Sequence, residues 1–306
     1  MSDQVRIVEV GPRDGLQNEK TPVSVEGRIA FIEALLAAGL HTVEVGAFVS
    51  PKAIPQMVGS DEVLRGVSRH ADGEFHVLVP NEKGYETARA NGAKVIAVFG
   101  SASEGFSRAN INCSVAESIE RFKPVIARAH ADGIKVRGYI SCVLGCPYDG
   151  EIKPKAVVDV AKVLWNLGCY EVSLGDTIGV GTPKKARELL RAVASDVPIT
   201  HLAMHFHDTY GQALANLYAG MEEGARVIDS AAGGLGGCPY APGATGNVAT
   251  EDVVYMLEGM GMGIATGVDI AKLVAATNEI SKLIGRLPVS RVATALNAKK
   301  GRANRE

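Results

Sequence analysis

Residues 201–223, HLAMHFHDTYGQALANLYAGMEE, contain the repeating unit that decides the fold. A short, mostly apolar run from His201 to Phe206 is followed, after a polar turn, by an amphipathic stretch from Gln212 to Glu223. The first pattern is typical of a buried β-strand and the second of an α-helix. We therefore interpret this segment as one strand–helix unit with polar residues where the strand ends.

The same alternation recurs along almost the whole chain. Short β-branched runs predict strands at Val5–Val10, Thr42–Val45, Phe75–Val79, Val95–Phe99, Val136–Cys142, Glu171–Leu174, His201–Phe206 and Val227–Ser230. The stretches between them predict helices that include Glu26–Ala38, Val115–Ala131, Lys155–Leu167, Pro183–Ala194 and Gln212–Glu223. Strand–helix units repeated over about 250 residues predict an α/β protein, a (β/α)8 TIM barrel. A doubly wound sheet is the alternative, although the first unit lacks the GxGxxG fingerprint of its nucleotide-binding form.

The C-terminal part predicts helices beyond the barrel. The stretch from Gly259 to Gly267 indicates a joint before a helical region from Val268 to Ile284, and the polar residues 297–306 predict a frayed tail. The glycine-rich residues 233–247 indicate either a flexible loop or a backbone that closely approaches a ligand. We therefore expect one barrel domain over residues 1–306 with no second domain.

Composition restricts the classes of partner. The chain has 306 residues, of which 46% are hydrophobic, and a net charge of -2. Its basic residues are scattered, so the one-sided positive field that grips nucleic acid is not expected. No apolar run approaches the roughly 18 residues of a membrane span, and the N-terminus lacks a secretory signal. Because the 5 cysteines are thinly spread, we expect free thiols and a cytoplasmic protein without membrane or nucleic-acid partners.

Polar residues gather where predicted strands end, which is where a TIM barrel carries its active site. His205 and His207 are two residues apart, so both imidazoles face the same side of a strand and predict a metal site. Asp14 would add an anionic oxygen and Asn247 a neutral one. Two nitrogens and two oxygens, with positions left open, suit Mg²⁺ or Mn²⁺ better than a structural zinc ion.

Other residues near these strand ends have both a catalytic and a structural interpretation. Arg13 could form a surface ion pair or face developing negative charge. Glu44 lies within an apolar strand and needs a cation such as Arg13. Asp176 could cap a helix or act in catalysis. Cys238 could be a small buried residue, or a thiol that reaches substrate from its glycine-rich loop.

Four motifs are recognisable together: VGPRDGLQNE, VEVGAFVSPK, HFHDTYGQALAN and GGLGGCPYAPGATGNVATED. They closely resemble the 3-hydroxy-3-methylglutaryl-CoA lyase family of metal-dependent TIM-barrel lyases, in order from about Val5 to Ile284. The resemblance implies a homodimer in which Arg13 stabilises enolate charge and Cys238 completes catalysis. It also implies a divalent cation held by Asp14, His205, His207 and Asn247, with support from Gln17, Glu44, Asp176 and Glu251.

The reaction implied by the family is cleavage of (S)-3-hydroxy-3-methylglutaryl-CoA to acetyl-CoA and acetoacetate, in leucine breakdown and ketone-body formation. This metal-assisted retro-Claisen step needs a base for the C3 hydroxyl, for which Asp176 and His205 are both candidates. It also needs a cation for the enolate oxygen, which Arg13 can supply, and an acid for the enolate carbon, which Cys238 can supply.

Three alternatives remain at this level. Many relatives carry hydroxyl residues after the strand-two glutamate where this chain has Gly46 and Ala47, so a longer 3-hydroxy-3-alkylglutaryl-CoA is an alternative substrate. A metal-dependent Claisen-type synthase usually adds a regulatory region that this length does not accommodate. A silent barrel that only binds a CoA ester would not need the full set of polar residues.

Overall fold

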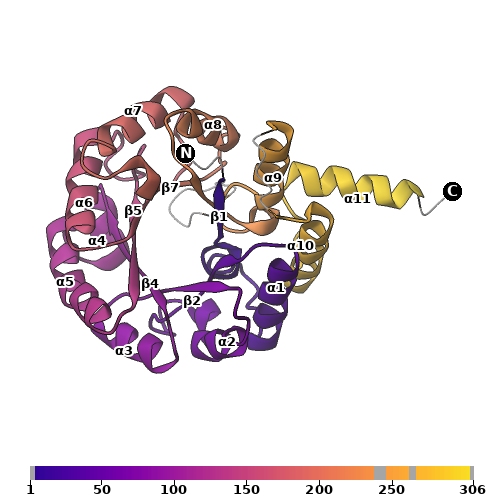
Figure 1. Ribbon diagram of the computed structural model, residues 1–306, viewed down its shortest axis with the longest axis horizontal. Coiled ribbons are helices and arrows are strands. Elements are labelled where there is room, and N and C mark those ends of the chain that lie inside the picture. Colours follow the sequence, from indigo (N-terminus) through magenta and orange to yellow (C-terminus); the bar gives the residue numbers. More distant parts are fainter. Residues whose placement is uncertain (1–3, 238–245, 262–266, 304–306) are drawn as a thin grey trace.

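A computed structural model describes residues 4–237, 246–261 and 267–303. Within them, eight parallel strands form a closed barrel in which each strand pairs with the next and β8 pairs with β1 (Figure 1). The strands are β1 (Arg6–Glu9), β2 (Thr42–Ala47), β3 (Glu74–Leu78), β4 (Val95–Ser101), β5 (Lys135–Ser141), β6 (Glu171–Asp176), β7 (Leu202–Phe206) and β8 (Val227–Ser230). The expected (β/α)8 barrel is confirmed, because in an open doubly wound sheet β8 would not pair with β1.

Helices surround the strands in a ring (Figure 1). They are α1 (Val25–Ala37), α2 (Ser60–Val67), α3 (Glu82–Ala90), α4 (Glu104–Ile111), α5 (Val115–Ala131), α6 (Pro154–Asn166), α7 (Pro183–Val193), α8 (Ala213–Glu222), α9 (Thr250–Gly259), α10 (Ile270–Ile284) and α11 (Arg291–Ala303). Capping side chains and prolines determine where several helices begin. Ser114 and Glu117 form a capping box at α5, and α6 and α7 each begin with proline. Among the described helices, none is long and apolar enough to cross a membrane.

Short helical turns connect some of these elements. They are η1 (Gly11–Gly15), η2 (Pro55–Met57), η3 (Ile199–His201) and η4 (Ala232–Gly234). His201 therefore belongs to a turn and not to the strand predicted there. Its N–H donates to the carbonyl of Pro198. Conversely, β6 extends to Asp176 because that residue pairs with Phe206 in the β6–β7 ladder.

The C-terminal helices differ partly from expectation. Helix α10 begins at Ile270, because the Asp269 side chain accepts hydrogen bonds from the N–H groups of Ala271 and Lys272. The expectation of a frayed tail from residue 297 is wrong as far as Ala303, since α11 continues to that residue and stands away from the barrel (Figure 1). Asn297 and Asn278 exchange two amide hydrogen bonds that join α11 to α10. The predicted joint lies partly outside the described residues, which omit 262–266.

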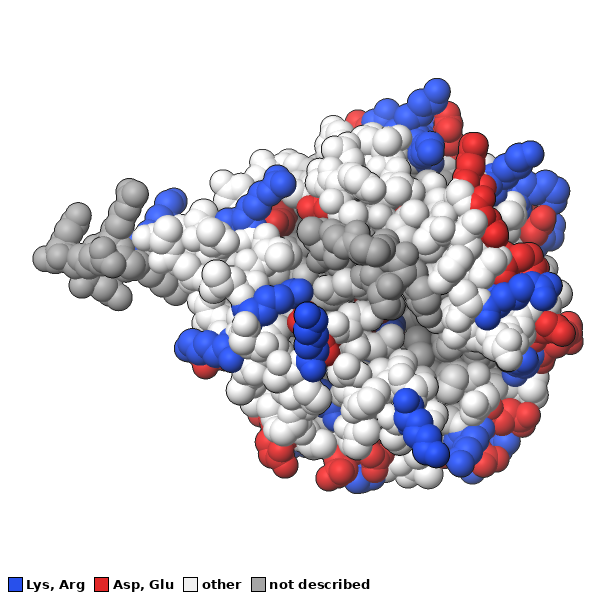
Figure 2. Space-filling view, turned by 180° about the vertical axis from the view of Figure 1, so that it is seen from behind, with Lys and Arg blue, Asp and Glu red and all other residues white. Residues whose placement is uncertain are grey.

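The main core lies between the barrel and its helices. Side chains such as Ile32 and Leu35 of α1, Ile126 of α5 and Leu164 of α6 are almost completely buried against the strands. On the face shown in Figure 2, Lys and Arg side chains are interspersed with Asp and Glu, mainly around the rim. This mixture agrees with the scattered charges of the sequence.

Candidate metal centre

Three potential metal ligands converge at one end of the barrel. Asp14, His205 and His207 each offer an oxygen or nitrogen atom, and these atoms lie within 4.8 Å of one another. Asp14 comes from η1, which follows β1, and His205 lies near the end of β7 with His207 just beyond it. The Nε2 atom of His205 is 3.8 Å from Oδ2 of Asp14. The spacing of two in the sequence does bring the two imidazoles together.

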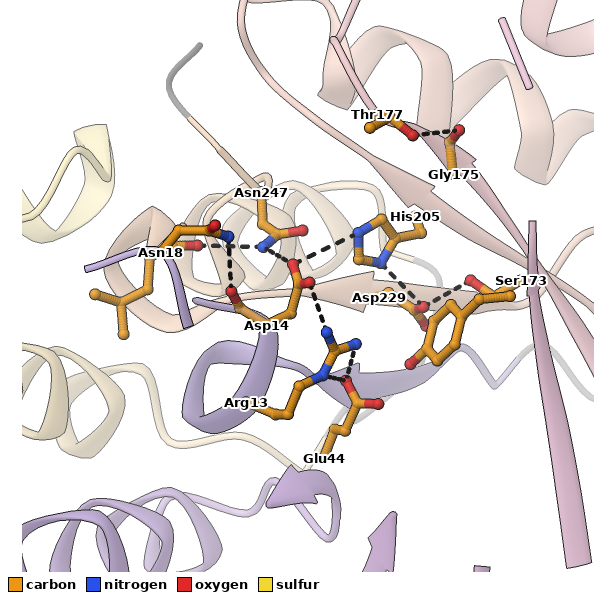
Figure 3. Close-up of polar contacts among 12 residues, drawn as sticks. Arg13, Asp14, Asn18, Glu44, Ser173, Gly175, Thr177, His205, Asp229 and Asn247 are labelled. Carbon is orange, nitrogen blue, oxygen red and sulfur yellow. Dashed lines mark hydrogen bonds and ion pairs between the residues drawn. The ribbon is translucent and has the colours of Figure 1, made fainter. Parts of the chain in front are cut away.

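Asn247 completes the arrangement from the segment that returns after β8. Backbone bonds from Val248 N–H to Phe206 and from Asp208 N–H to Gly246 hold this segment beside the end of β7. The Asn247 amide nitrogen donates to Oδ2 of Asp14 at 2.8 Å and to the Leu235 carbonyl at 3.2 Å. Its buried oxygen has no hydrogen-bond partner among the described residues, and Figure 3 shows it turned toward the gap between Asp14 and His205. A carboxylate, two imidazoles and this amide oxygen fit a divalent cation.

The protonation states of Asp14 and His207 also suit metal binding. Burial raises the pKa of the Asp14 carboxyl, but the cation of Arg13, together with His205 and the hydrogen bond from Asn247, outweighs it and lowers the pKa to about 2. Burial, together with the neighbouring His205, lowers the pKa of His207 to about 4. At neutral pH Asp14 is therefore an anion and His207 a neutral imidazole, the forms in which these side chains bind metal.

Arg13 lies against this cluster and is fixed by two carboxylates. Its Nε and Nη2 atoms lie 2.7 and 2.6 Å from Oε2 of Glu44, and Nη1 lies 2.9 Å from Oδ1 of Asp14 (Figure 3). Glu44 is completely buried in β2, so the cation that its burial requires is Arg13, as the sequence suggested. Burial lowers the pKa of Arg13, but the carboxylates of Glu44 and Asp14 together outweigh burial, so the pKa is raised and the side chain stays charged.

The turn that carries Arg13 and Asp14 is closed by backbone contacts and a buried glutamate. The Gly15 N–H donates to the Val10 carbonyl at 3.1 Å. A Cβ on Gly15 would lie 2.7 Å from Cβ of Leu235, so only glycine permits this approach. Glu9 Oε1 accepts the N–H groups of Gly11 at 2.8 Å and of Ala232 at 3.0 Å, joining the first and last barrel loops. Glu9 was not predicted as a site residue, although a carboxylate inside an apolar strand is the same signal that identified Glu44.

Two further predicted residues, Glu251 and Asp176, accept hydrogen bonds from backbone N–H groups. Both carboxylate oxygens of Glu251 accept the Gly233 N–H, at 3.0 and 2.9 Å, at the start of the glycine-rich segment. Asp176 accepts the N–H groups of Val180 at 3.2 Å and Gly181 at 2.8 Å in the turn before α7. Burial raises the Asp176 pKa to about 6. These bonds hold the turn and do not cap α7, because the N-cap of that helix is Thr182 and has no side-chain capping bond.

Two other predicted residues contribute less to the described geometry. The Gln17 side-chain oxygen is buried and has no hydrogen-bond partner among the described residues. Cys238 and most of the predicted catalytic loop lie outside the described residues, which resume at Gly246. Beside Asn247, a cavity of about 440 Å³ extends toward Asp208 and Arg291. Of the four proposed metal ligands, only Asn247 lines this cavity, so the cavity adjoins the cluster and does not contain it.

A family model described as HMGL-like matches residues 4–280. The chain belongs to the HMGL-like family. A 3-hydroxy-3-isohexenylglutaryl-CoA/hydroxy-methylglutaryl-CoA lyase of Pseudomonas aeruginosa is 57% identical to this HMGL-like protein, over 97% of this chain and 98% of its own. The crystal structure of a hydroxymethylglutaryl-CoA lyase from Pseudomonas aeruginosa is 56% identical and superposes with a TM-score of 0.94, covering 98% of this chain and 99% of that one.

A third HMGL-like structure is more distant in sequence. It is an HMG-CoA lyase from Acinetobacter baumannii in complex with coenzyme A and 3-methylmalate, 36% identical with a TM-score of 0.91, and it covers 96% of each chain. The resemblance inferred from the four motifs is therefore confirmed at the level of the family and the fold.

Proposed function

We propose that this HMGL-like protein is a carbon–carbon lyase that cleaves (S)-3-hydroxy-3-methylglutaryl-CoA to acetyl-CoA and acetoacetate. The observation that carries the proposal is a hard-cation ligand cluster with a fixed guanidinium beside it, at one end of the barrel. The named lyases that cover nearly all of this chain support the same activity.

Asp14, His205, His207 and Asn247 would hold the divalent cation, and their oxygen and nitrogen donors favour Mg²⁺ or Mn²⁺. When bound there, such a cation supplies a Lewis acid that lowers the pKa of a substrate hydroxyl. The protein's part is to present these four side chains with the right protonation states. The low pKa values of Asp14 and His207 put these two side chains in their metal-binding forms at neutral pH.

The retro-Claisen step moves one proton and one bonding pair. A base takes the C3 hydroxyl proton, the C2–C3 electrons pass into the thioester as an enolate, and C3 becomes the ketone carbon of acetoacetate. Arg13 is positioned to stabilise the enolate oxygen, because Glu44 and Asp14 hold its guanidinium in place before charge develops. Protonation of the enolate carbon, which we assign to Cys238 from the sequence, gives acetyl-CoA.

Asp176 and His205 remain the two candidates for the base. With a pKa of about 6, Asp176 is mostly ionised at neutral pH and able to accept a proton. Its carboxylate also holds the backbone of the following turn. We propose Gln17, Glu44 and Glu251 as supporting residues, of which Glu44 acts by holding Arg13 and Glu251 by holding Gly233.

Chain length of the acyl group is the main question within this activity. The relative from Pseudomonas aeruginosa carries both an isohexenyl and a methyl substrate in its name. In this chain the hydroxyl of Ser60 donates to the Met57 carbonyl and accepts the Ala47 N–H at 3.1 Å. A Cβ on Gly46 would lie 2.7 Å from that hydroxyl oxygen. A side chain at position 46 would therefore displace Ser60, and the small residues after Val45 are set by local packing.

The test is turnover of the purified full chain with Mg²⁺ and 3-hydroxy-3-methylglutaryl-CoA, with acetyl-CoA and acetoacetate both quantified. We expect equal amounts of the two products. A parallel assay with 3-hydroxy-3-isohexenylglutaryl-CoA measures the acyl preference, and folded Arg13→Met protein is the matched control. Absence of both products from protein that binds the cation would contradict the proposal, and a higher kcat/KM for the longer ester would favour the alternative substrate.

We also infer a cytoplasmic homodimer that acts in leucine breakdown. Buried free thiols such as Cys113 and Cys169 are compatible with a reducing compartment. Sedimentation equilibrium at micromolar concentration distinguishes a dimer from a monomer, and a single species at 32.1 kDa would contradict this inference.

A further inference from the structure

A buried aspartate on β8 lies directly behind the cluster of metal ligands. Asp229 is completely buried inside the barrel. Its Oδ2 atom lies 3.2 Å from Nδ1 of His205 and accepts the Ser173 hydroxyl at 2.8 Å (Figure 3). The sequence analysis did not single out Asp229, because it predicted the run Val227–Ser230 only as a strand.

A second buried residue fixes Asp229 in place. Both terminal nitrogens of Arg137, on β5, donate to the Asp229 carboxylate, at 2.7 and 3.0 Å. The same guanidinium donates to Glu171 and to the hydroxyl of Tyr139, each at 2.7 Å. A planar guanidinium held on three sides has little freedom to rotate. Asp229 is therefore a rigid, ionised acceptor.

This acceptor has a consequence for the imidazole in front of it. An ionised carboxylate can only accept hydrogen bonds, so Nδ1 of His205 must carry a proton. In the neutral ring, the form that binds a metal, the unprotonated nitrogen is then Nε2, which lies 3.8 Å from Oδ2 of Asp14. The ring thus presents its lone pair toward the other metal ligands, as in carboxylate–histidine–metal arrangements.

We propose that Asp229 is a positioning residue that fixes the tautomer and ring orientation of His205 for metal binding, with Arg137 and Ser173 holding its carboxylate. This inference rests on the proposed function, because it requires a cation bound by His205. The competing explanation is that the buried ion pairs only stabilise the barrel. Both explanations expect lower stability when Asp229 changes, so stability alone cannot separate them.

The chain offers a matched control at the other end of the same guanidinium. Glu171 accepts Arg137 Nε and also pairs with Arg6, but its hydrogen bonds do not involve His205. Asp229→Asn and Glu171→Gln each remove one buried negative charge from Arg137 with almost no change in shape. Only the first removes the charge that faces His205.

The experiment measures Mn²⁺ affinity by titration calorimetry on folded wild-type, Asp229→Asn and Glu171→Gln proteins. We expect Asp229→Asn to bind roughly 10- to 100-fold more weakly, the usual cost of losing such a supporting carboxylate. Glu171→Gln should bind as the wild type does, although its thermal midpoint falls. Equal affinities of both variants and the wild type would overturn the inference, whereas a wild-type protein that binds no Mn²⁺ would overturn the proposed metal centre itself.

A second measurement does not require a variant to fold. Long-range ¹H–¹⁵N spectra of metal-free wild-type protein, recorded at a pH high enough for the ring to be neutral, report which nitrogen of His205 carries its single proton. We expect the Nδ1–H form, and the Nε2–H form would overturn the inference.

Discussion

The ion pair between Arg13 and Glu44 gives the most informative test of the site. Arg13→Met removes three charged contacts, two to Glu44 and one to Asp14, while it keeps a side chain of similar length. Glu44 would remain completely buried without a cation. Removal of one partner from a buried ion pair costs about 3–5 kcal/mol, so we expect a loss of unfolding free energy in this range.

The double variant Arg13→Met/Glu44→Gln separates stability from catalysis. A neutral amide at position 44 no longer needs a cation, so most of the lost unfolding free energy should return. The rate should not return, because the enolate oxygen still lacks its fixed positive charge. We expect kcat to fall by on the order of 10² or more in the single and the double variant, with KM little changed. Arg13→Lys should also lose kcat, because an ammonium cannot reproduce the planar guanidinium.

Urea unfolding followed by circular dichroism gives the free energies, and steady-state kinetics at saturating Mg²⁺ gives kcat and KM. Both should be measured for the wild type, for Arg13→Met, for Arg13→Lys and for the double variant. A double variant that regains kcat would refute the catalytic assignment of Arg13. A raised KM with unchanged kcat would make Arg13 a binding residue.

Three further predictions concern the metal, a buried carboxyl and the thiol. EDTA should abolish activity, and Mg²⁺ or Mn²⁺ should restore it. Full activity in metal-stripped protein would contradict the mechanism. His207→Ala should weaken Mn²⁺ binding, as measured by calorimetry. Burial raises the pKa of Glu9 from 4.5 to about 7, so its ionisation disfavours the folded state as pH rises through this interval. Glu9→Gln should therefore reduce the decline in Tm between about pH 5 and 8, and an unchanged slope would exclude Glu9 as its source. Cys238→Ser should keep its Tm and lose most of its kcat, whereas near wild-type kcat with a lowered Tm would make the thiol structural.

Local patterns predicted the barrel because each strand and helix carries its own periodicity. The strand Val227–Ser230 has the bounds expected from its apolar run. Strand ends depended instead on pairing with neighbours: Asp176 joins β6 through its ladder with Phe206, and a bulge after Glu44 lets β2 continue to Ala47. The tail was misjudged because the contact between Asn278 and Asn297 has no local signature.

The site was predictable where spacing alone aligns side chains. His205 in β7 and His207 just beyond it face the same side by strand geometry, and the buried Glu44 required a cation close by. Asp229 was missed because its partners are contributed by other strands, Arg137 being 92 positions away. Glu9 carries the same local signal as Glu44, a carboxylate within an apolar strand, but its contact with Ala232, 223 positions away, has no such signal.

The pairing of β8 with β1 also determines when the metal ligands can meet. Asp14 is synthesised among the first residues and Asn247 only after the last strand, yet the two side chains are in hydrogen-bond contact. A nascent chain that ends before Asn247 therefore has an incomplete ligand set, however well its earlier strands have formed. A cation that binds the full set favours closed barrels over open ones by mass action. Metal capture should thus coincide with closure of the ring, late in the folding of the chain.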